Sequence, residues 1–87
     1  MKRVLFVDDE PRVLEGLKRM LYPIRNRWEM VFVAGGKQAL ELLDQAEFDL
    51  LITDIRMPCM TGIDLLQEVV KRHPQVIRIV LSGTADQ

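Results

Sequence analysis

The sequence has little of what several large classes of protein require. Its 87 residues include one cysteine, Cys59, so no intrachain disulfide can form, and a reducing, cytoplasmic setting is expected. Twelve basic against thirteen acidic residues give a net charge of −1, which offers neither a basic surface for direct nucleic-acid contact nor a polybasic membrane patch. The apolar runs are too short to span a bilayer. No repeat or Gly/Ser-rich linker divides the chain, so we expect one domain over residues 1–87.

Four short apolar runs alternate with three amphipathic segments. The apolar runs at 4–7, 30–33, 50–52 and 76–81 have the length and the β-branched content of buried strands. The segment between the first two begins at Pro11, carries apolar residues at helical spacing, and is stopped by Tyr22-Pro23. This alternation predicts an α/β fold with right-handed crossovers and a mainly parallel, doubly wound sheet.

Polar residues follow three of the four expected strands: Asp8-Asp9, Asp54 and Ser82. Ligands of such sheets bind outside the carboxyl ends of the strands. If the first and third strands are neighbours, about 4.8 Å apart, Asp9 and Asp54 can approach one cation, with Asp8 close behind. Carboxylate oxygens suit Mg²⁺, and no cluster of histidine and cysteine competes for a softer metal.

A carboxylate beside Mg²⁺ can also act as a nucleophile, and Asp54 is the candidate to attack a phosphorus atom. The Ser82 hydroxyl and backbone N–H groups after Asp54 and at Gly83 would contact the phosphoryl oxygens. Each element also has a simpler interpretation: Asp9 as the cap of the helix at Pro11, Ser82-Gly83 as a turn, and Asp54 as a loop acid. The combination of acid, Met-Pro, Met and Gly over residues 54–62 is harder to explain by packing.

Two motifs carry a resemblance to a known family. They are Val4-Leu5-Phe6-Val7-Asp8-Asp9-Glu10 and, more specific, Asp54-x-x-Met57-Pro58-x-Met60-x-Gly62. The chain resembles, over essentially its whole length, the receiver domain of two-component response regulators. That resemblance implies a flavodoxin-like sheet with strand order 2-1-3-4. It also implies a phosphoacceptor rather than a turnover enzyme, a sensor histidine kinase as phosphoryl donor, and an output domain as the regulated partner.

The resemblance also assigns roles at the acidic edge by position. Asp54 matches the phosphoacceptor, Asp9 the direct acidic Mg²⁺ ligand, and Asp8 the acid that acts on the metal through water. The backbone carbonyl of Arg56 matches the third protein ligand. Cys59 has no role in this pattern and is interpreted as a loop thiol.

The end of the sequence departs from the family pattern. Ser82 matches the hydroxyl residue that turns toward the phosphoryl group, and Gly83 the small residue after it. A complete receiver continues through a fourth helix, a fifth strand and a fifth helix, and the fifth strand ends in a lysine that pairs with the phosphoryl oxygens. None of the chain's lysines fits that place: Lys2, Lys18, Lys37 and Lys71. We therefore expect a C-terminally truncated receiver that lacks helix 4, strand 5 and helix 5.

Three further classes of function remain to be weighed. Without a fifth strand, the strand at 76–81 would present a bare apolar edge, which favours a non-catalytic interaction fragment that pairs with another chain or forms a homodimer by strand exchange. An Mg²⁺-dependent phosphatase would carry a second acid two residues after Asp54. This chain has Arg56 at that position, which argues against a phosphatase. A dinucleotide-binding enzyme is disfavoured because no Gly-x-Gly-x-x-Gly follows the first strand.

Overall fold

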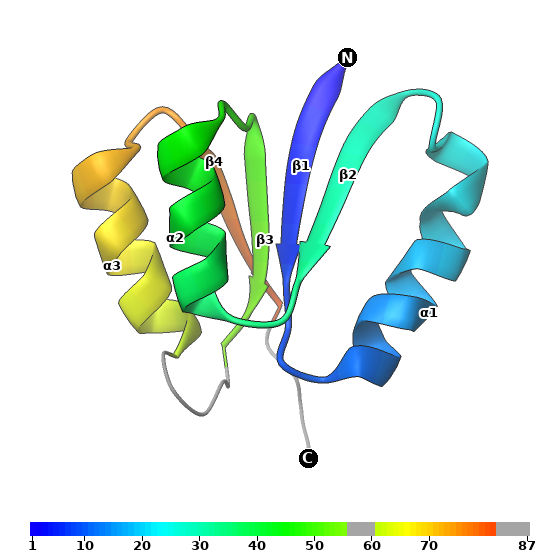
Figure 1. Cartoon of the computed structure of the whole chain (residues 1–87), viewed down its shortest axis with the longest axis horizontal. Helices are drawn as coiled ribbons and strands as arrows, with labels where there is room; N and C mark the ends of the chain where they lie inside the picture. Colours follow the sequence, from blue (N-terminus) through cyan, green and yellow to red (C-terminus); the bar gives the residue numbers. More distant parts are fainter. Residues whose placement is uncertain (56–60, 82–87) are drawn as a thin grey trace.

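The computed structural model describes residues 1–55 and 61–81. Strands and helices alternate through these residues, as the sequence predicts (Figure 1). In chain order they are β1 (Lys2–Val7), α1 (Pro11–Leu21), the short 3₁₀ helix η1 (Tyr22–Ile24), β2 (Trp28–Val33), α2 (Gly36–Gln45), β3 (Leu50–Asp54), α3 (Gly62–Arg72) and β4 (Ile77–Leu81).

The four strands form one parallel sheet in the order β2-β1-β3-β4. The strand order and the flavodoxin-like, doubly wound class are therefore confirmed. The register places Val7 of β1 beside Val33 of β2 and beside Thr53 of β3, so these strands end at one edge. That common edge gathers the residues that follow β1 and β3.

Three of the four strands extend beyond their apolar runs, whereas β4 begins at Ile77, one residue after the start of its predicted run. β2 begins at Trp28, two residues before the predicted run, because its ladder with β1 already starts at the pair Lys2 and Trp28. β3 likewise continues through Thr53 to Asp54, where it pairs with β4. Backbone pairing, which does not depend on side-chain polarity, sets these limits.

The helix starts differ in how they are capped. Glu10, not Asp9, occupies the N-cap position of α1, and no side-chain cap bond is present there. The capping interpretation of Asp9 is therefore wrong, which leaves its carboxylate available to the sheet edge. At α3 the Thr61 side chain accepts a hydrogen bond from the Asp64 N–H at 3.1 Å, a standard cap that fixes the start of this helix.

The two faces of the sheet are covered unequally. α2 and α3 pack against each other over one face, where Leu5 and Leu51 are completely buried (Figure 1). Because successive side chains of a strand alternate, Phe6 points to the opposite face, where its ring stacks on Phe32 with centroids 4.7 Å apart. α1 contributes the buried Leu14 and stands apart from α2 and α3, beside β2. Within residues 1–55 and 61–81, no helix has the length and apolarity needed to cross a bilayer.

Candidate functional site

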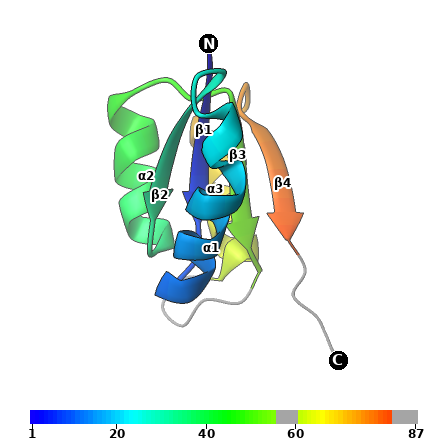
Figure 2. The same ribbon diagram turned by 90° about the vertical axis from the view of Figure 1, so that its right-hand side faces the viewer.

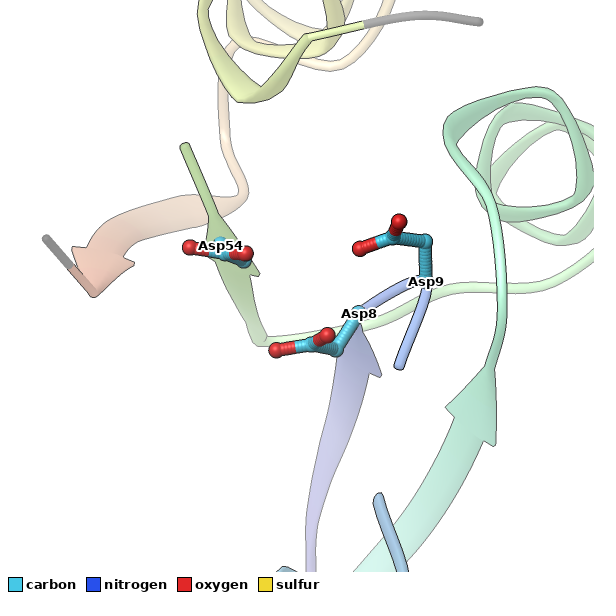
Figure 3. Close-up of side chains that lie close together, drawn as sticks. All are labelled: Asp8, Asp9 and Asp54. Carbon is cyan, nitrogen blue, oxygen red and sulfur yellow. The ribbon is translucent and has the colours of Figure 1, made fainter. Parts of the chain in front are cut away.

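Three carboxylates meet at the carboxyl edge of the sheet. Asp8 and Asp9 directly follow β1, and Asp54 is the last residue of the neighbouring β3. One oxygen from each of the three lies within 4.8 Å of the others. Figure 3 shows these side chains gathered around the ends of the two strands. The structure therefore brings together the three acids that the sequence analysis selected.

Hydrogen bonds to the backbone hold two of the acids in place. The Asp8 side chain, with 7% of the residue exposed, accepts a bond from the Glu10 N–H at 2.8 Å. The Asp8 N–H in turn donates to the Val33 carbonyl at 3.2 Å, which ties the end of β1 to the end of β2. The Asp54 carboxylate accepts a bond from the Ile55 N–H, also at 2.8 Å. Backbone donors use one oxygen of each of these carboxylates, and the cluster keeps other oxygens for a ligand.

Burial and like charge make the cluster electrostatically unfavourable without a cation. The pKa of Asp8 is raised above its unperturbed value of 3.8, first by desolvation on burial and then by the negative charges of Asp54, Asp9 and Glu10. The hydrogen bond from the Glu10 N–H acts in the opposite direction. A divalent cation would relieve this repulsion, and the donor set consists of carboxylates only, the chemistry that Mg²⁺ prefers. The residues present therefore fit a magnesium ion.

The start of α3 packs directly against the end of β3. A Cβ added to Gly62 would lie 2.2 Å from the Asp54 carbonyl oxygen and 2.8 Å from the Ile55 Cα, so only glycine fits. The Gly62 N–H donates to the Ile55 carbonyl at 3.0 Å. Gly62 belongs to the motif over residues 54–62, but its contact with the end of β3 was not predicted. A glycine before an apolar helix has many explanations.

Thr53 also supports the site, although it was not selected from the sequence. It is completely buried, and its hydroxyl donates to the Asp54 carbonyl at 3.0 Å. This bond adds a side-chain anchor to the end of β3 just before the acid. A threonine inside a strand is common, so the sequence alone carries no signal for this role.

Three of the selected site residues fall outside the described part of the chain. These are Arg56, with its backbone carbonyl, Ser82 and Gly83. Their assignments therefore stay predictions that the resemblance supplies. The placed part of the site consists of the acidic cluster and the contacts that hold it.

Comparison with known proteins identifies relatives of the whole chain. The family model described as "Response regulator receiver domain" matches residues 4–87. HoxA of Cupriavidus necator, a hydrogenase transcriptional regulatory protein, is 37% identical over 95% of this chain. The response regulator protein PilR of Pseudomonas aeruginosa is 39% identical over 98% of it. The chain spans 17% of HoxA and 19% of PilR, so these relatives are several times longer.

Solved structures show the same architecture. The signal receiver domain of an HD domain-containing protein from Pseudomonas fluorescens matches 98% of this chain with a TM-score of 0.88 and 33% identity, and the match covers 66% of that chain. TrrA of Thermotoga maritima, a response regulator crystallised with Mg²⁺ and BeF, matches with a TM-score of 0.86 and 34% identity, over 98% of this chain and 72% of TrrA. The family match, the fold and these relatives agree, and the chain belongs to the response regulator receiver domain family.

Proposed function

We propose that Asp54 accepts a phosphoryl group from a phosphohistidine of a sensor histidine kinase, at a site where Asp8, Asp9 and Asp54 hold Mg²⁺. The observation that carries this proposal is the meeting of the three carboxylates within 4.8 Å at one sheet edge. The similarity to TrrA supports it, because TrrA has been crystallised with Mg²⁺ and BeF and also in complex with the histidine kinase ThkA.

The chemical step is a transfer between two protein side chains. An oxygen of the Asp54 carboxylate attacks the phosphorus, and the bond between phosphorus and the donor imidazole nitrogen breaks. The imidazole leaves with the electron pair, and an aspartyl phosphate remains on Asp54. The hydrogen bond from the Ile55 N–H orients the attacking carboxylate. The metal, when bound, neutralises charge on the phosphoryl oxygens.

The remaining roles follow from the resemblance. The Arg56 carbonyl would be the third protein ligand of the metal, and the Ser82 hydroxyl, followed by the small Gly83, would contact the phosphoryl group. The chain would act as a phosphoacceptor whose modified form regulates an output domain. It would not be a turnover enzyme, because the phosphoryl group is stored on its own side chain.

Mass spectrometry tests the phosphoacceptor directly. The chain is incubated with acetyl phosphate and Mg²⁺, and we expect one added phosphoryl group that is absent from Asp54→Asn. Glu41→Gln, which changes an exposed acid on α2, is the matched control and should be modified like the parent. Equal modification of the parent and of Asp54→Asn would refute the assignment, as would no modification of the parent together with no Mg²⁺-dependent change in the NMR signal of Ile55.

We propose a second role, self-association through β4, on a separate observation. All five residues of β4 are exposed, with Ile77 60% and Ile79 40% accessible, and β3 is its one strand neighbour among the described residues. An apolar strand at a sheet edge pairs readily with another chain. Light scattering should show a dimer that Val80→Lys dissociates, whereas Gln67→Lys, on the exposed surface of α3, leaves it intact. A parent that stays monomeric at high concentration would disprove this role.

A further inference from the structure

A hollow lies beside β2, on a part of the molecule that the acidic site does not use. Its volume is about 390 Å³, it is open to solvent, and residues of α1, η1 and β2 contribute to its lining together with Met1 and Arg25. Three aromatic residues line it, together with two cationic ones: Tyr22, Trp28, Phe32, Lys18 and Arg25. Trp28 is the first residue of β2, whereas the acids lie beyond the strand ends at the opposite edge of the sheet.

The segment 11–28, which supplies half of the residues that line this hollow, is strongly basic in a chain that is slightly acidic overall. Residues 11–28 hold five of the twelve basic residues but one of the thirteen acids, Glu15. Of those five cations, Lys18 is the one that pairs with a carboxylate within the described residues, at 3.4 Å from Glu15. The others therefore produce a positive potential that favours an anionic ligand.

The two lining cations are already positioned by the aromatic side chains. The Arg25 guanidinium lies 3.7 Å from the centroid of the Tyr22 ring, and its Nη1 donates to the Tyr22 carbonyl at 2.9 Å. Lys18 Nζ lies 5.5 Å from the centroid of the Phe32 ring. Such cation–π contacts restrict both side chains before any ligand arrives. Restricting them in advance lowers the entropy cost of binding.

The one acid in the lining does not cancel this charge. Glu29 Oε2 lies 3.5 Å from Arg3 Nε, so the negative charge of Glu29 is directed toward β1. Arg3 itself lies over Phe48, with its guanidinium carbon 4.8 Å from the ring centroid. The hollow therefore offers aromatic surfaces with an excess of positive charge.

We propose that this hollow binds a small ligand in which a planar ring is joined to an anionic group, the chemistry of a mononucleotide. The ring would stack on Trp28 or Tyr22, and a phosphate would pair with Arg25 and Lys18. The volume lies in the range of roughly 300–1,000 Å³ found for small-molecule sites. This site is independent of Asp54 chemistry, because no residue is shared between them.

Trp28 is the single tryptophan of the chain and lines the hollow, so quenching of its fluorescence measures ligand binding. AMP and GMP are titrated separately into the intact chain, with adenosine and inorganic phosphate as probes of the ring and of the charge alone. We expect saturable quenching by at least one nucleotide below about 1 mM, with adenosine and phosphate at least about tenfold weaker. Asp54→Asn should bind the nucleotide like the parent, which separates this result from the phosphoacceptor test.

One charge variant, one aromatic variant and a matched control decide whether the hollow itself is the site. Arg25→Gln should weaken nucleotide binding by about fivefold or more, and Tyr22→Leu should do the same through lost stacking. Arg19→Gln is the matched control, because Arg19 is exposed on α1 and does not line the hollow; it should change the affinity less than about twofold. Thermal unfolding of each variant establishes that it is folded.

Three results would overturn the proposal. The first is no saturable quenching by either nucleotide up to about 10 mM, an affinity too weak for a formed site. The second is an equal loss of affinity in Arg25→Gln and Arg19→Gln, which would indicate attraction by general charge. The third is binding of a single-stranded oligonucleotide without binding of a mononucleotide, which would assign the surface to nucleic acid instead.

Discussion

β1 and β4 are both apolar, parallel strands of one sheet, yet their surroundings differ completely. The last four residues of β1, Val4 to Val7, are at most 3% exposed, whereas every residue of β4 is exposed (Figure 2). β1 lies between β2 and β3 with helices over both faces, and β4 contacts β3 alone among the described strands. The composition of a strand therefore predicts that it pairs within a sheet, whereas its position in the sheet determines how far its side chains are buried.

The same difference explains where the candidate site is located. Asp8, Asp9 and Asp54 follow or end the two inner strands, β1 and β3, whose backbones are fixed by pairing on both sides. A site on rigid inner strands keeps its carboxylates close together despite their repulsion.

The largest expected effect contrasts the two strands directly. Leu5→Ala removes a completely buried side chain of β1 and should destabilise the fold by about 2–5 kcal/mol. Ile79→Ala in β4 removes a side chain that is already 40% exposed and should cost less than about 1.5 kcal/mol. Urea unfolding followed by circular dichroism measures both losses. Similar losses in the two variants would show that β4 is buried in solution, for example by self-association.

The next effect concerns the contact that fixes the end of β3. Gly62→Ala places a methyl group against the Asp54 carbonyl and should cost about 1–3 kcal/mol or displace the acid. Gly16→Ala in α1 is the matched control, because no atom lies within 4 Å of its added Cβ. It should stabilise α1 by about 0.5–1 kcal/mol. Thermal unfolding distinguishes the two, and a harmless Gly62→Ala would contradict the described packing.

Most of the fold could be predicted from the sequence because its signals are local. Short apolar runs and helical spacing identified every strand and α-helix, and the alternation fixed the parallel sheet. The strand ends were less predictable, since Trp28 and Thr53 join the ladder through backbone bonds that their side chains do not reveal. The short helix η1 was missed because Pro23 reads as a stop signal, although it is also accepted in the first turn of a helix.

The acidic cluster could be predicted because parallel strands end at a common edge. Asp8, Asp9 and Asp54 follow from strand order together with the position of each acid in its strand. The supporting contacts could not be predicted. The contact of Gly62 depends on the packing of α3 on β3, and the bond from Thr53 depends on the orientation of its hydroxyl within β3. The hollow that Trp28 and Phe32 share with Lys18 could not be predicted either, because it depends on how α1 lies beside β2.

The third effect tests electrostatic strain at the end of the inner strands. Burial and neighbouring acids raise the folded-state pKa of Asp8, so the folded state binds this proton more tightly than the unfolded state does. Stability is therefore lost as the pH rises from about 3.8 through that raised pKa. Asp8→Asn cannot ionise, so without divalent cations it should be more stable than the parent at neutral pH, by roughly 0.5–2 kcal/mol, the range of typical charge optimisations.

The measurement is thermal unfolding in EDTA at several pH values and again with Mg²⁺. The advantage of Asp8→Asn should shrink as the pH falls through the raised pKa of Asp8 toward its unperturbed value of 3.8, because the folded parent takes up its proton in this interval. Mg²⁺ should stabilise the parent more than the variant. β4 contains no acidic residue, so this dependence on pH is expected at the ends of the inner strands and not in β4. A variant that is less stable than the parent in EDTA at neutral pH would contradict the charge argument.

The smallest effect concerns the helices that cover the inner strands. On α2, Asp44 Oδ2 lies 3.0 Å from Arg72 Nη1, and Asp44 Oδ1 lies 2.7 Å from His73 Nε2. The Asp44 carboxylate therefore joins α2 to the end of α3. Asp44 and Arg72 are exposed whereas His73 is half-buried, and Asp44→Asn should cost about 0.2–1 kcal/mol. Urea unfolding at low and high salt should show that the loss shrinks as salt screens the pairs. Glu41→Gln on the same helix is the control and should show no comparable salt dependence. A large loss that salt does not weaken would contradict the screened-pair interpretation, and would mean that Asp44 holds α2 to α3 through hydrogen bonds or packing rather than through exposed charge.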